Sequence, residues 1–223
     1  MTRPFQKEID RLKRRVLQLT AVVEDNLRAS VRSVIERDAD LADRVVEEDN
    51  EIDQMEVELE EECLKILALH QPVAIDLRFV IAALKINNDL ERIGDLAVNI
   101  AKLLPMLLPV SERKVPFDLP AMLQLALSMV QRSADSLVDL DVDGARAVCE
   151  SDDELDDMHY EARDAVEQEI QRNPDLTGYY LSLLLISRNL ERIGDHATNI
   201  AEDVIYMVEG EIIRHRGKTS ARQ

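Results

Sequence analysis

The sequence predicts an all-α protein built from two tandem three-helix bundles that are related by internal duplication. The clearest observation is a repeat, because residues 90–95 (Leu-Glu-Arg-Ile-Gly-Asp) recur unchanged at residues 190–195. Aromatic residues make up 3% of the chain and only 6 of its 223 residues are glycine, a composition typical of long packed helices. In addition, no segment shows the sustained alternation of polar and apolar residues that predicts a half-buried strand.

Three helices are predicted in the first half. The first spans about residues 5–36, where apolar residues alternate at spacings of four and three, as in the seam of a packed bundle. Asp38 or Asp40 is the expected N-cap of the second helix, which runs to about His70. The third helix follows Pro72, a residue tolerated in the first helical turn, and runs to about Leu104.

Proline marks the boundary between the halves, since four of the seven prolines lie at positions 105, 109, 116 and 120. They predict a linker over residues 109–118, between a first domain of residues 1–108 and a second of residues 119–223. The second half repeats the order of the first, with predicted helices over about residues 119–140, 143–172 and 174–214. We expect each half to fold as an antiparallel three-helix bundle.

The formal net charge of −18 argues against general nucleic-acid binding, because phosphate backbones attract Lys and Arg. Metal cations or basic protein surfaces are better partners for such a chain. The N-terminus has no apolar core of a signal peptide, and no uninterrupted apolar run approaches the roughly 20 residues that span a bilayer. Cys63 and Cys149 form no paired motif and are expected to be buried apolar residues. The cytoplasm is therefore the expected compartment.

Each copy of the repeat carries two carboxylates four residues apart, Glu91 with Asp95 and Glu191 with Asp195. Four residues advance an α-helix by roughly 6 Å and rotate it by about 40°, so both side chains project from one face. This face begins with an apolar line at residues 77, 81 and 84, and continues with the polar residues 88, 91 and 95. Such a line predicts carboxylates that are partly buried between helices, where they need protons, cationic partners or metal.

A glycine precedes the aspartate in both copies, at Gly94 and Gly194. Glycine inside a helix costs about 1 kcal/mol relative to alanine. We expect the close approach of another element to be the reason. The alternative is an incidental glycine that was inherited by duplication.

A second acidic pair lies on the preceding helix of each half, Asp49 with Asp53 and Asp152 with Asp156. The two pairs of each half can face each other across a seam, and carboxylates with an asparagine oxygen suit hard or borderline cations. The alternative is a solvated acidic face. This alternative is serious for residues 47–62, where ten residues are acidic and none is Lys or Arg.

The histidines and arginines near these pairs have different expected roles. His159 lies close to the carboxylate face and is a further candidate ligand. His196 points about 100° away from Asp195 around the helix axis. It is expected to be a packing residue or to contact a metal ligand from outside the coordination shell. Arg92 and Arg192 are expected to turn away from the carboxylate face and to make packing or ion-pair contacts.

The doubled motif at residues 90–95 and 191–202, with residues 71–78 before the first copy, resembles the PhoU family of phosphate-system regulators. The resemblance covers nearly the whole chain. It implies two three-helix bundles, a homodimer, and multinuclear iron or zinc clusters on the paired carboxylates. By position, the implied ligands are Asp49, Asp53, Glu91, Asp95, Asp152, Asp156, Glu191 and Asp195, and weaker candidates are Asn99, Asn199 and Glu202. Because Asn88 becomes Arg188 in the second half, the two sites need not bind the same ions.

The resemblance also implies a role in signal transduction. Members of the family act as negative regulators of the phosphate-starvation response and modulate high-affinity phosphate uptake. They are thought to link the ATPase subunit of the phosphate transporter to a sensor histidine kinase, which would bring the protein to the membrane through its partners only.

No catalytic nucleophile is evident, so the chain is not expected to be an enzyme. One alternative is a di-metal carboxylate enzyme of the oxidase type, although such bundles usually carry Glu-x-x-His pairs and the nearest match here is Asp156 with His159. The other alternative is a helical scaffold without metal.

Overall fold

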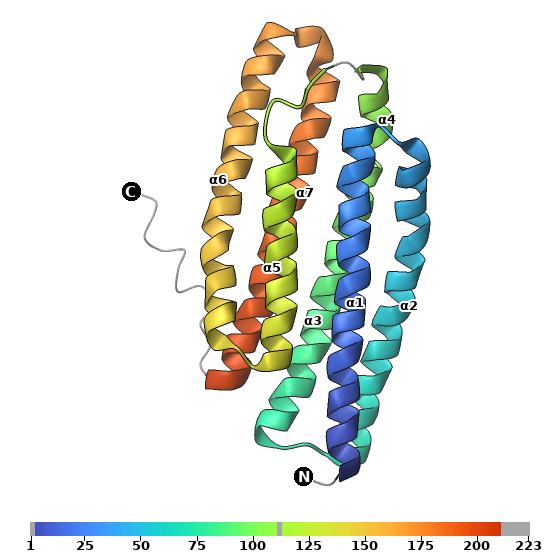
Figure 1. Cartoon of the computed structure of the whole chain (residues 1–223), viewed down its shortest axis with the longest axis vertical. Helices are drawn as coiled ribbons and strands as arrows, with labels where there is room; N and C mark the ends of the chain where they lie inside the picture. Colours follow the sequence, from blue (N-terminus) through green and yellow to red (C-terminus); the bar gives the residue numbers. More distant parts are fainter. Residues whose placement is uncertain (1–2, 111–112, 211–223) are drawn as a thin grey trace.

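The computed structural model describes residues 3–110 and 113–210, and this part of the chain contains helices and no strand. The first bundle consists of α1 (Arg3–Glu36), α2 (Ala39–His70) and α3 (Ala74–Ala101), and the second of α5 (Leu119–Asp139), α6 (Val142–Arg172) and α7 (Thr177–Glu209). Short helical turns connect them: α4 (Leu104–Leu107), η1 (Leu108–Val110) and η2 (Pro174–Leu176). The predicted all-α fold of two three-helix bundles is confirmed (Figure 1).

Aspartate caps determine where three of the helices begin. The Asp38 carboxylate accepts a hydrogen bond from the backbone N–H of Leu41 at 2.9 Å, which selects Asp38 over Asp40 as the cap of α2. Asp118 and Asp141 cap α5 and α6 in the same way. A side-chain acceptor at this position satisfies a backbone donor that the helix itself leaves unpaired.

Two helix ends differ from the sequence prediction. The third helix was predicted to reach Leu104, but α3 ends at Ala101 and a separate turn, α4, follows. The last helix was predicted to reach residue 214, but α7 ends at Glu209, because Gly210 has a φ of 75° and ends the helix in the left-handed region. Residues 211–214 lie outside the described residues.

The two bundles pack side by side through α3 against α7 and α1 against α5. Figure 1 shows that the helices of each of these pairs run in opposite directions. One apolar cluster extends through both bundles and includes the repeat residues Leu90 and Leu190, which are fully buried. The repeat motif therefore contributes to the core with its leucine and isoleucine, and leaves its carboxylates at the edge of that core.

The segment Ala74–Val110, which includes α3, is long and apolar enough to cross a membrane by length and composition alone. Half of its most apolar window is buried inside the bundles. A central helix of a helical bundle has the same features, so this segment is accounted for by the core.

Candidate metal sites

Close contact between α2 and α3 is permitted by Gly94. A Cβ atom at this position would lie 3.1 Å from Cδ1 of Ile52 and 3.3 Å from Oδ1 of Asp49. The second bundle repeats the arrangement, since a Cβ at Gly194 would lie 2.6 Å from Cδ2 of Leu155 and 3.6 Å from an oxygen of Asp152. Both glycines thus face the helix that carries the second acidic pair, which confirms the predicted reason for their presence.

Replacing Gly94 by leucine is expected to lower the free energy of unfolding by about 1–3 kcal/mol, because the added side chain must push α2 away. Urea unfolding followed by circular dichroism measures the change. Gly178 is a matched control on α7, since nothing lies within 4 Å of a Cβ built there. Leucine at Gly178 should leave the stability unchanged or slightly higher, and an equal loss in both variants would contradict the close packing at Gly94.

In the first bundle, the predicted carboxylates come within electrostatic reach of one another. Burial, followed by the carboxylates of Asp53 and Asp95, raises the pKa of Asp49 to about 6. Burial and the Asp95 carboxylate also raise the pKa of Glu91, and Asp53 and Glu56 add to this increase. Like charges on partly buried carboxylates destabilise the ionised forms, so a bound cation would relieve the repulsion within this cluster.

Glu91 also carries a buried oxygen, Oε2, that accepts no hydrogen bond in the described part of the chain. Arg92 lies near it, with Nε 3.5 Å from this oxygen and Nη1 3.2 Å from Oδ2 of Asp95. Arg92 therefore makes ion pairs, as expected, but the prediction that it turns away from the carboxylates is wrong, because its long, half-exposed side chain folds back along α3 toward Glu91 and Asp95. A buried acceptor without a hydrogen bond, beside repelling carboxylates, fits the chemistry of a metal ligand.

The second bundle brings its carboxylates together in the same way. Burial, followed by the charges of Asp195 and Asp156, raises the pKa of Glu191, and Asp152 adds to the increase. The guanidinium of Arg188 acts against them and lowers this pKa. The other three predicted carboxylates of this half therefore lie within electrostatic reach of Glu191, and together they form a cluster on α6 and α7.

The weaker candidate ligands differ in their exposure. Asn99 and Asn199 are exposed, and Glu202 is half-buried. His159 is half-buried on α6, where its Nδ1 lies 2.9 Å from the hydroxyl of Ser187, and burial together with the Arg188 and Arg163 cations lowers its pKa.

His196 contacts the other bundle, with Nδ1 2.8 Å from Oδ1 of Asp89 on α3. It therefore joins the two bundles to each other.

Sequence reasoning missed Glu56, which lies on α2 one turn beyond Asp53. Its Oε1 accepts a hydrogen bond from Nδ2 of Asn87 at 3.2 Å, and its charge contributes to the raised pKa of Glu91. The signal was present in the sequence, since Glu56 follows Asp49 by seven residues, as His159 follows Asp152.

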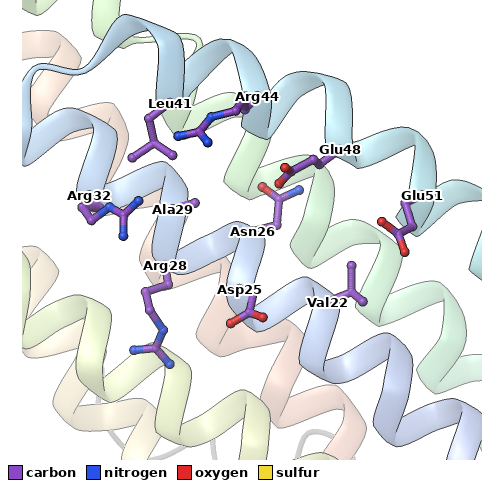
Figure 2. A pocket seen from close by; sticks show the side chains of 10 residues that line it. All are labelled: Val22, Asp25, Asn26, Arg28, Ala29, Arg32, Leu41, Arg44, Glu48 and Glu51. Carbon is purple, nitrogen blue, oxygen red and sulfur yellow. The ribbon is translucent and has the colours of Figure 1, made fainter.

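Other acidic residues of α2 face a different part of the protein. Figure 2 shows Glu48 and Glu51 at a groove of about 490 Å³ between α1 and α2, which is also lined by Arg28, Arg32 and Arg44. Glu58 and Glu62 form ion pairs with Arg15 of α1 at 3.2 and 2.9 Å. Only part of the acidic stretch of α2 therefore faces α3, and the rest is solvated or paired with arginines.

The helices bring the paired carboxylates of each bundle near one another, but the side chains do not form a coordination shell. Among the residues that the structure describes, no three His, Cys, Asp or Glu side chains already stand where they could share one metal ion. Exposed carboxylates such as Asp53 are free of tight packing and can rotate toward a cation. In chemical type, carboxylate oxygens beside one another are donors that a metal cation accepts, but in their present positions they do not form a metal site.

The raised pKa values predict an unusual pH dependence of the metal-free protein. A carboxyl group that binds its proton more tightly in the folded state favours folding at low pH, and this contribution is lost as the pH rises through the folded pKa. Between pH 4 and 7, the free energy of unfolding of the metal-free protein should fall by about 1 kcal/mol relative to that of an Asp49→Asn variant. This figure allows for solvent screening of the half-buried Asp49 carboxyl group. Urea unfolding at several pH values tests this, and a constant difference between the two proteins would contradict it.

Comparison with known proteins identifies the family. The family model of the PhoU domain matches twice, over residues 16–104 and 119–204. The phosphate-specific transport system accessory protein PhoU homolog 1 of Thermotoga maritima is 36% identical over 211 residues, which cover 93% of this chain and 90% of that relative. The corresponding homolog of Pseudomonas aeruginosa is 34% identical over 224 residues, covering 100% of this chain and 93% of the relative.

Solved structures agree with this result. The crystal structure of PhoU from Pseudomonas aeruginosa matches with a TM-score of 0.86 and 35% identity, covering 93% of this chain and 100% of that one. The structure of the phosphate transport system regulatory protein PhoU from Streptococcus pneumoniae matches with a TM-score of 0.86 and 26% identity, covering 94% and 99%. The family consists of accessory proteins, which confirms that this chain is not an enzyme and excludes the oxidase alternative. On the strength of both domain matches and these relatives, the chain belongs to the PhoU family.

Proposed function

We propose that the chain is a metal-binding regulatory adaptor of phosphate homeostasis, which represses the phosphate-starvation response and modulates high-affinity phosphate uptake. The observation that carries the proposal is the pair of carboxylate clusters, each of which lies where two helices approach each other over a glycine of the repeat. The names of the relatives, accessory proteins of a phosphate-specific transport system, support the connection to phosphate uptake.

Iron or zinc is the expected metal at each cluster. The residues that would hold it are Asp49, Asp53, Glu91 and Asp95 in the first bundle, and Asp152, Asp156, Glu191 and Asp195 in the second. A bound cluster would supply positive charge between helices that otherwise repel each other through their carboxylates. In this role the metal stabilises one arrangement of the bundles and of the surface that partners contact.

The expected partners are proteins. We propose that the chain forms a homodimer in the cytoplasm and contacts the ATPase subunit of the phosphate transporter and a phosphate-sensing histidine kinase. Its membrane association would then come from these partners. A net charge of −18 favours contact with basic protein surfaces over nucleic acid, because an acidic chain repels a phosphate backbone.

The proposal is tested by elemental analysis of the protein purified from its native source, together with a pull-down that probes for the transporter ATPase and the kinase. Bound iron or zinc and recovery of both partners are expected. Protein that is free of metal, and whose stability does not change on adding iron or zinc, would contradict metal binding. Full repression by a Glu91→Ala/Asp95→Ala variant that has lost its metal would show that the metal is not needed for regulation.

A further inference from the structure

The groove between α1 and α2 that Figure 2 shows is separate from the carboxylate clusters, because its lining residues include none of the proposed metal ligands. It measures about 490 Å³ and extends along residues 22–32 of α1, which span roughly 15 Å of helix. Arg32 and Arg44 lie toward one end of it, and Val22 and Glu51 lie toward the other (Figure 2). The groove therefore has a basic end and an acidic end.

The second bundle offers an internal comparison for this groove. Helices α1 and α5 end at residues 36 and 139, and α2 and α6 begin at residues 39 and 142, so these helices correspond at an offset of 103 residues. At this offset, the three arginines of the groove correspond to residues without positive charge. The pairs are Arg28 with Gln131, Arg32 with Asp135, and Arg44 with Ala147. Packing of a three-helix bundle of this kind therefore does not require the arginines.

A buried polar side chain, Asn26, also lines the groove. It is only 3% exposed, and its Nδ2 donates a long hydrogen bond to the backbone oxygen of Val45 at 3.4 Å. Its Oδ1 accepts no hydrogen bond from the residues that the structure describes. A buried acceptor without a donor is destabilising, and the corresponding residue of the second bundle is the apolar, buried Met129. Packing therefore does not explain Asn26, whereas a ligand that brings a hydrogen-bond donor does.

The arginines of the basic end are free to bind an anion. Arg44 is exposed and forms no ion pair with a carboxylate in the described part of the chain. Arg32 is also exposed, and its Nε lies 3.8 Å from the Glu36 carboxylate, a loose contact. Each guanidinium presents a planar fork of donors that can bind two oxygens at once. Two such groups on different helices suit a phosphoryl group, because its three oxygens can be shared between them.

The acidic residues determine what can be attached to that phosphoryl group. Asp25, Glu48 and Glu51 line the rest of the groove, and ionised carboxylates can only accept hydrogen bonds. They repel a second phosphate and favour hydroxyl groups. Among the described residues that line the groove none is aromatic, so no side chain there can stack on a nucleobase. A sugar that carries one phosphate has both parts, whereas inorganic phosphate would occupy only the basic end.

We propose that this groove binds a sugar phosphate, with its phosphoryl group between Arg32 and Arg44 and its hydroxyl groups at Asn26, Glu48 and Glu51. Asn26 accepts a hydrogen bond from a sugar hydroxyl, which satisfies its buried oxygen. The inference goes beyond the proposed metal-binding function and does not depend on it, because the site shares no residue with the carboxylate clusters.

Isothermal titration calorimetry of the full chain with ribose 5-phosphate tests the site. Ribose 5-phosphate should bind at least about 10-fold more tightly than inorganic phosphate, and Arg44→Ala, which copies Ala147, should weaken its binding about 10- to 100-fold. Asn26→Met, which copies Met129, should also weaken binding and should leave the free energy of unfolding unchanged or higher. Arg14→Ala is the matched control, since it removes an exposed arginine of α1 that lies outside the groove.

The titration is repeated after a chelator has removed any metal, and circular dichroism confirms that every variant is folded. Binding that persists without metal and is weakened by Arg44→Ala supports the site. Binding that requires metal, or that is equally strong in Arg44→Ala and Arg14→Ala, would overturn it, as would the absence of binding to the full chain. Inorganic phosphate or adenosine 5′-monophosphate that binds more tightly than ribose 5-phosphate would overturn the choice of ligand. The metal content of the same samples tests the proposed metal function separately.

Discussion

Replacing Glu91 by Gln and Asp95 by Asn is expected to empty the first metal site and at the same time to stabilise the metal-free protein. Metal affinity at this site should fall by at least about 100-fold, since changes outside the ligand shell already cost about 10- to 100-fold. Stability of the metal-free form should rise because the substitutions remove two charges that repel the partly buried carboxylates of Asp49 and Asp53. Elemental analysis and urea unfolding, each with and without metal, measure both effects.

The prediction is specific because the same variant should bind metal more weakly and yet be more stable in its metal-free form. Metal should stabilise the wild type by mass action and should stabilise the variant much less. The matched control, Glu51→Gln, lies on the other face of α2 and should alter neither metal content nor the response to metal. A variant that is equally destabilised with and without metal would show that Glu91 and Asp95 serve the fold.

The second large effect is expected at the interface between the bundles. Nζ of Lys85 on α3 lies 3.0 Å from Oδ1 of Asp203 on α7, and the Asp203 side chain is only 4% exposed whereas that of Lys85 is 43% exposed. Lys85→Ala should destabilise the protein by about 3 kcal/mol, because a buried carboxylate loses its lysine. Asp203→Asn should cost less, since Lys85 can turn into water.

Urea unfolding measures the two variants, with Lys65→Ala, an exposed lysine of α2, as the control. Because one apolar cluster extends through both bundles, unfolding should stay a single transition. Equal losses for Lys85→Ala and Lys65→Ala would contradict the importance of the pair, and two separate transitions would contradict a shared core.

Local sequence signals were sufficient to predict the helices and their arrangement within each half. The spacing of Leu12, Val16, Leu19 and Val23 marks one buried stripe of α1, and all four side chains are fully buried. No local sequence pattern predicts how the two bundles pack against each other. Asp89 and His196, and Lys85 and Asp203, are joined across more than one hundred residues, and nothing near either partner in the sequence indicates the other.

The candidate site was predictable where the duplication repeated it and not where the copies differ. The pairs Glu91 with Asp95 and Glu191 with Asp195 stood out because they recur unchanged. Glu56 was missed because its counterpart in the second half is a histidine, so a comparison of the two halves does not pair it with another carboxylate. Ion pairs of Arg92 were expected, but not with Glu91 and Asp95, because helical spacing gives the direction of a side chain at its base and not where a long, half-exposed one ends.

The most direct test of metal binding is anomalous diffraction from crystals of the zinc- or iron-loaded protein, recorded at the absorption edge of the metal. We predict peaks at two carboxylate clusters, one on α2 and α3 and one on α6 and α7, with carboxylate oxygens at roughly 2.0–2.2 Å if the metal is zinc. Loaded crystals without a peak at either cluster, or with metal only elsewhere on the surface, would contradict the account.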